Sequence, residues 1–162
     1  MPARALFGIN VLFGFLAWGV VAWLYIWPKL RQQKRADALR PILVLHAFRF
    51  VGLAFLIPGV VSPDLPIAFA RPAACGDLLT AVLALSALAT LHRRGGIILV
   101  WAFNAIGTAD LLYAFYEGNR VGIGDAPGLQ GAAYFIPTAL VPLFLITHGF
   151  VFRLLLQRKE SP

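Results

Sequence analysis

Five apolar segments, each long enough to cross a bilayer, constrain this chain more than any other feature. An α-helix rises about 1.5 Å per residue, so about 20 apolar residues cross a hydrocarbon layer of about 30 Å. The segments lie at residues 5–27, 41–61, 74–91, 96–116 and 131–152. They predict an all-α, polytopic integral membrane protein that forms one transmembrane domain, a five-helix bundle.

The composition supports a lipid environment. Of 162 residues, 60% are hydrophobic and only 13% are charged. A soluble domain of this size has too little interior for so many apolar side chains, so the lipid bilayer is the expected partner. The net charge of +7 is spread over short runs between the apolar segments. A nucleic-acid-binding protein would gather its basic residues on one solvated face, so we expect no nucleic-acid partner.

The basic residues predict the orientation. Three lie in the connections on one side: Arg4, Arg71 and Arg120. Ten lie in the first connection, the third connection and the C-terminal segment: Lys29, Arg31, Lys34, Arg35, Arg40, Arg93, Arg94, Arg153, Arg158 and Lys159. Lys and Arg accumulate on the cytoplasmic side of membrane proteins. This bias predicts an N-terminus outside and a C-terminus in the cytoplasm, in a bacterial-type inner membrane.

Proline and glycine residues suggest where the helices begin and end. Pro41 suits the first turn of the second span, where its missing N–H costs no hydrogen bond. Pro63, Pro66 and Pro72 predict that residues 62–72 are not regular helix. By these limits Asp77 lies in the first turn of the third span.

Polar residues within the spans are the candidates for function, because lipid penalises them. Their positions predict two layers with Asn104 between them. His46, Arg49 and His148 form the inner layer, and Asp77, Asp110 and Glu117 form the outer layer. Tyr113 and Tyr134 can extend the outer layer, and Tyr134, Thr138 and His148 share one helical face of the fifth span.

Three carboxylates in one layer are more than the contacts between helices require, so we expect a polar cavity between spans three, four and five. It would bind a small molecule or ion, with transport or proton relay as further possibilities. The candidate ligand-binding residues are Arg49, Asp77, Asn104, Asp110, Tyr113, Glu117, Tyr134 and Thr138. Acid–base catalysis stays open, although the sequence contains no recognised nucleophile motif.

Two alternatives remain from the residues alone. His46 and His148 lie at similar predicted depths in spans two and five, as the axial ligands of a b-type haem would. The protein would then be an electron-transfer protein with haem b as its cofactor. The small size and short loops also fit a non-catalytic accessory subunit of a membrane complex.

Overall fold

The computed structural model describes residues 1–93 and 95–157, so Arg94, Arg158 and Lys159 lie outside the described residues. The described chain is helical and contains no β-strand, apart from an isolated bridge between Pro58 and Val61. Five of its helices are long and apolar enough to cross a membrane. These are Ala3–Leu30, Arg35–Leu56, Ile67–Thr90, Gly96–Arg120 and Ile136–Leu156.

Three of the five long helices combine α-helix with tighter or wider turns. The first consists of α1 (Ala3–Val21), a π-helical stretch η1 (Ala22–Ile26) and α2 (Trp27–Leu30). The second consists of α3 (Arg35–Ala47) and a 3₁₀ helix η2 (Phe48–Leu56). The third and fourth are α4 (Ile67–Thr90) and α5 (Gly96–Arg120). A 3₁₀ helix η3 (Pro127–Tyr134) precedes the fifth, which consists of a π-helical η4 (Ile136–Leu140) and α6 (Val141–Leu156).

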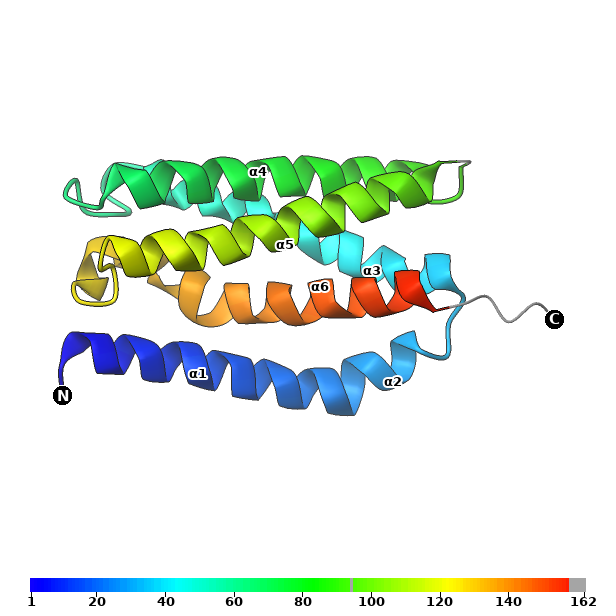
Figure 1. Ribbon diagram of the computed structural model, residues 1–162, viewed down its shortest axis with the longest axis horizontal. Coiled ribbons are helices and arrows are strands. Elements are labelled where there is room, and N and C mark those ends of the chain that lie inside the picture. Colours follow the sequence, from blue (N-terminus) through cyan, green and yellow to red (C-terminus); the bar gives the residue numbers. More distant parts are fainter. Residues whose placement is uncertain (94, 158–162) are drawn as a thin grey trace.

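The long helices lie side by side, and the N-terminus of α1 and the C-terminal end of α6 are at opposite ends of the bundle (Figure 1). The helix pair α4 and α5 packs together, and α3 and η2 lie against α4. Helix α1 flanks the bundle along η4 and α6. The end that contains the 31–34 connection and the end of α6 is called the basic end, and the opposite end is called the N-terminal end.

The second and third spans begin earlier than the sequence suggested. Pro41 lies inside α3 and Pro72 lies inside α4, so the prediction that they mark a helix start and a non-helical segment was wrong. Each proline removes a hydrogen bond to the carbonyl four residues before it. Those carbonyls belong to Asp37 and Ala68, in the first turns of α3 and α4.

The 3₁₀ helix η2 determines which side chains of the second span face inward. A 3₁₀ helix has about three residues per turn, so residues i, i+3 and i+6 lie in one line. The buried residues of η2 are Arg49, Gly52 and Phe55, which follow this spacing. The tight turns therefore place an arginine and a phenylalanine on the same inner face.

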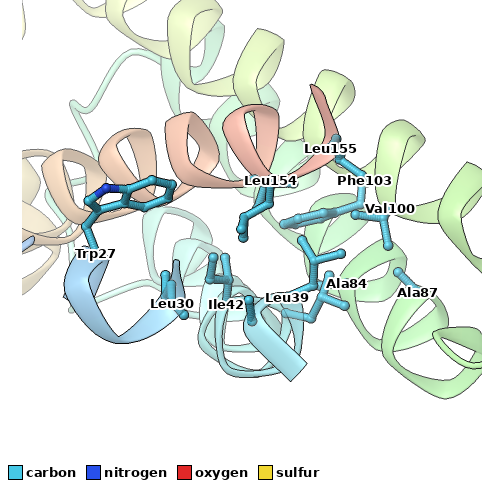
Figure 2. Packing of buried hydrophobic residues seen from close by; sticks show 13 residues of the cluster. Trp27, Leu30, Leu39, Ile42, Ala84, Ala87, Val100, Phe103, Leu154 and Leu155 are labelled. Carbon is cyan, nitrogen blue, oxygen red and sulfur yellow. The ribbon is translucent and has the colours of Figure 1, made fainter. Parts of the chain in front are cut away.

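A buried apolar cluster closes the basic end of the bundle (Figure 2). Residues of all five spans contribute to it, and Leu39, Leu43, Val100 and Phe103 are completely buried. We call this group the basic-end cluster. Its members are Trp27, Leu30, Ala38, Leu39, Ile42, Leu43, Ala84, Ala87, Val100, Phe103, Val151, Leu154 and Leu155.

Candidate functional site

The guanidinium group of Arg49 lies at the centre of the bundle with no exposure to solvent. Its Nε donates to Asp77 Oδ1 at 2.7 Å, and its Nη2 donates to Asp110 Oδ2 at 2.5 Å. Its Nη1 donates to the carbonyl of Gly107 at 3.1 Å. A buried charge is tolerated only when it is paired and hydrogen-bonded, and Arg49 meets both conditions. We call Arg49, Asp77 and Asp110 the charged cluster.

Glycines make room for this cluster. A Cβ at Gly52 would lie 2.0 Å from Asp77 Oδ2, and a Cβ at Gly76 would lie 1.6 Å from Asp110 Oδ1. Both distances are far below van der Waals contact. Only glycine at these two positions lets each carboxylate lie directly against the backbone of the neighbouring helix.

Two histidines extend the polar network toward the basic end. Arg49 Nη1 also lies 3.2 Å from His148 Nε2. Because arginine can only donate, His148 Nε2 accepts, and its Nδ1–H donates to Asn104 Oδ1 at 2.7 Å. His46 Nε2 lies 2.9 Å from Thr147 Oγ1. Since Thr147 donates to the carbonyl of Leu143 at 2.9 Å, it accepts from His46.

The predicted separation into two layers was wrong, because Arg49 contacts both Asp77 and Asp110 directly. Asp77 follows the first residue of α4 by ten residues, and Asp110 precedes the last residue of α5 by ten. At about 1.5 Å per residue, both lie about 15 Å from the N-terminal end of the bundle. Asp77 is therefore near the middle of its helix and not in the first turn.

A cavity of about 290 Å³ extends from the charged cluster toward the N-terminal end. Asp77 and Asp110 line it at the mid-bundle end, and Arg4 and Asp125 line it where α1 begins. Most of the remaining lining is apolar or aromatic: Phe7, Gly8, Val11, Phe55, Phe69, Ala73, Leu111, Ala114, Phe115, Ile123, Ile136, Pro137 and Val141. The cavity is thus a mainly apolar chamber with two carboxylates at its end.

Besides the fully buried Arg49 and Asn104, four candidate residues lie outside the cavity lining. Tyr113 is 48% exposed on the surface of α5. Glu117 Oε2 accepts from both Nε and Nη2 of Arg120, at 2.9 and 2.7 Å. The hydroxyl of Tyr134 accepts from Asn10 Nδ2 at 2.7 Å, and the hydroxyl of Thr138 donates to the Tyr134 carbonyl at 2.9 Å. Only the Tyr134 bond to Asn10 joins two of the long elements, because Glu117 and Arg120 both belong to α5 and Thr138 bonds within its own span.

Asn104 does not line the cavity either, and it is linked to the charged cluster through His148.

The sequence did not predict that the first span lines the cavity. The cavity was expected between spans three, four and five, but Arg4, Phe7, Gly8 and Val11 of α1 form one wall. The signal available was weak, because a phenylalanine and a glycine in an apolar helix look like ordinary lipid-facing residues.

A bis-histidine haem does not fit this arrangement. Such a haem needs its iron and macrocycle between the two imidazoles. The ring centroids of His46 and His148 lie 4.2 Å apart, which is direct contact between the rings. Both nitrogens of His148 and Nε2 of His46 are also hydrogen-bonded within the protein.

Fold and site together define a class: an apolar five-helix bundle with a charged cluster at its centre and a cavity that leads to it. The chain belongs to the family described as Domain of unknown function (DUF8737), whose model matches residues 6–156. No curated protein matches the chain, and no solved structure matches it.

Proposed function

We propose that the protein spans a bacterial-type inner membrane five times, with its N-terminus outside and its C-terminus in the cytoplasm. Large apolar side chains on the outside of the bundle support insertion, including Leu12, Phe13 and Leu85, each more than half exposed. The concentration of Lys and Arg at the basic end supports the orientation.

Cysteine labelling tests this orientation. Cys75 is replaced by alanine, and single cysteines are introduced as Gln33→Cys at the basic end and Asp64→Cys at the N-terminal end. A membrane-impermeant maleimide should label the Asp64→Cys variant in intact cells and the Gln33→Cys variant only after lysis. The reverse pattern would overturn the proposed orientation.

We further propose that the protein binds a small molecule in the cavity between α1, α4, α5 and η4. The carrying observation is the cavity itself, about 290 Å³ in volume, which ends at Asp77 and Asp110. This volume is close to the lower end of ligand pockets, about 300–1,000 Å³. An apolar wall with a few polar groups at one end is the usual design of such a pocket, since the wall supplies affinity and the polar groups orient the ligand.

Binding is favoured over transport because the basic-end cluster lies beyond the charged cluster. Apart from the indole N–H of Trp27, its 13 buried members have no polar side-chain group that could solvate a ligand on the way to the other end. A ligand could pass the basic-end cluster only if the helices separated there. Binding in the cavity requires no such rearrangement. We therefore propose a binding site open toward one side.

The test uses a matched pair of glycines on α1. A Cβ at Gly8 or at Gly19 meets no atom within 4 Å, so a side chain can begin at either position without a clash, and leucine is introduced at each. Only Gly8 lines the cavity. The probes are 2-phenylethylamine, 2-phenylethanol and 3-phenylpropanoate, measured by calorimetry on the protein in lipid nanodiscs.

At least one probe should bind the wild type and the Gly19→Leu variant, and the Gly8→Leu variant should bind it at least about tenfold more weakly, because leucine occupies part of the cavity. The proposal fails if no probe binds the wild type. It also fails if Gly8→Leu leaves the affinity unchanged.

A further inference from the structure

The charges around the cavity do not balance. The guanidinium group of Arg49 faces two carboxylates, Asp77 and Asp110. The other two charged residues that line the cavity, Arg4 and Asp125, lie 3.8 Å apart and offset each other. Among the described residues around the cavity, one carboxylate therefore has no cation of its own.

Both carboxylates keep an oxygen for a further partner. Arg49 occupies Oδ1 of Asp77 and Oδ2 of Asp110. In the described part of the chain no donor reaches the other oxygen of either residue. The Asp77 side chain is only 7% exposed, and both residues line the cavity. Neither of these oxygens is among the buried side-chain atoms that lack a hydrogen-bond partner, so both are accessible from the cavity that the two residues line. A donor bound in the cavity can therefore pair with them.

The rest of the lining specifies the body of the ligand. Phe7, Phe55, Phe69 and Phe115 face the cavity, and the rings of Phe55 and Phe69 pack edge to face at 5.2 Å. Phenylalanine rings bind apolar groups by contact, and their faces attract cations. A bare metal ion would find few oxygen ligands here, and an anion would meet the two carboxylates.

We propose that the cavity takes a small organic cation, an ammonium group on a compact apolar body. The ammonium group lies at the mid-bundle end, where it supplies the missing positive charge and donates to Asp110 and Asp77. The apolar body lies among the phenylalanine rings. This inference rests on the proposed function and adds the chemical class of the ligand.

The three probes separate the inference from the proposed function, because they share a phenyl group and differ in the charge of the polar end. In nanodiscs at neutral pH, the amine should bind at least about tenfold more tightly than the alcohol, and the carboxylate should bind most weakly. If the alcohol binds as tightly as the amine, or the carboxylate binds best, the ligand class is wrong while a binding cavity remains. If none of the three binds, both proposals fail.

The Asp110→Asn variant tests the residue assignment. Arg49 keeps Asp77 as its counter-charge, and the cavity loses its excess negative charge, so the preference for amine over alcohol should disappear. Asp64→Asn is the matched control, because Asp64 is exposed and does not line the cavity. An unchanged preference in Asp110→Asn would overturn the assignment. The ranking of probes on the wild type decides the ligand class even if this variant does not fold.

Discussion

The two halves of the bundle are built from the same helices but packed in different ways. At the basic end, buried Leu, Ile, Val, Ala and Phe side chains of all five spans meet in a closed apolar cluster. From the middle of the bundle to the N-terminal end, the helices surround a charged cluster and a cavity. Both halves contain a buried apolar cluster, but in the N-terminal half that cluster lies beside the cavity.

Local helix geometry accounts for much of this difference. The basic half of the second and fifth spans is regular α-helix, in α3 and α6. Toward the N-terminal end the second span becomes the 3₁₀ helix η2, and the fifth span becomes the π-helical η4 around Pro137. Irregular turns change which side chains face inward and disturb close helix packing. In these two spans the regular half belongs to the filled core and the irregular half borders the cavity. The first span is the exception, because its π-helical η1 directly precedes Trp27 of the basic-end cluster.

The largest effect is expected from Arg49→Met, which removes the only cation of the charged cluster. Asp77 and Asp110 would then lie buried and unpaired, at a cost of about 3–5 kcal/mol. We expect little folded protein, measured as yield of monodisperse protein and as thermal unfolding in detergent. Arg40→Met is the control, since Arg40 is exposed on the same span. A stable Arg49→Met variant would show that the N-terminal half does not depend on its ion pairs.

A leucine in each half tests the packing difference directly. Leu39 in the basic-end cluster is 0% exposed, and Leu111 in the cavity wall is 2% exposed. Leu39→Ala should cost about 2–5 kcal/mol, because it creates a void in a filled core. Leu111→Ala should cost less, since part of its side chain already borders empty space. Equal losses in thermal stability would contradict the contrast between the halves.

The two histidines lie where the halves meet and should respond differently. His148→Phe removes an acceptor from Arg49 and the donor to Asn104, so it should cost about 1–3 kcal/mol. His46→Phe should cost less than about 1 kcal/mol, because Thr147 keeps its bond to Leu143 and the ring packs among Phe103 and Phe144. The melting temperatures of the two variants check this order. A larger loss of stability for His46→Phe than for His148→Phe would contradict it.

The smallest effect is expected from Arg4→Gln at the mouth of the cavity. The side chains of Arg4 and Asp125 are 66% and 58% exposed, so water and salt screen their attraction. Their loss should change stability by about 0–1 kcal/mol. Thermal unfolding is measured for this variant and for Arg49→Met. The two results compare the loss of an exposed ion pair with the loss of a buried one in the same half of the molecule. A large destabilisation would mean that the mouth is more enclosed than its exposure indicates.

The sequence by itself determined the helical class and the number of long apolar helices. Each such helix satisfies its own backbone hydrogen bonds, so length and apolar composition are sufficient to recognise it. The sequence also indicated which polar residues to consider, because Arg49, Asp77 and Asp110 stand in apolar surroundings. It did not predict the helix boundaries near Pro41 and Pro72, since a helix that is supported by its neighbours can contain a proline near its first turns.

Only the tertiary structure decided which of these residues meet. Arg49 and its two carboxylates come from three different helices, and their contact depends on the relative depth and rotation of those helices. Gly52 and Gly76 make the contact possible because they have no side chain. The sequence alone does not show which glycines lie against a carboxylate. The cavity likewise depends on where α1 lies against η4 and α6. Hydropathy is a property of each segment alone, whereas a site between helices is a property of their packing.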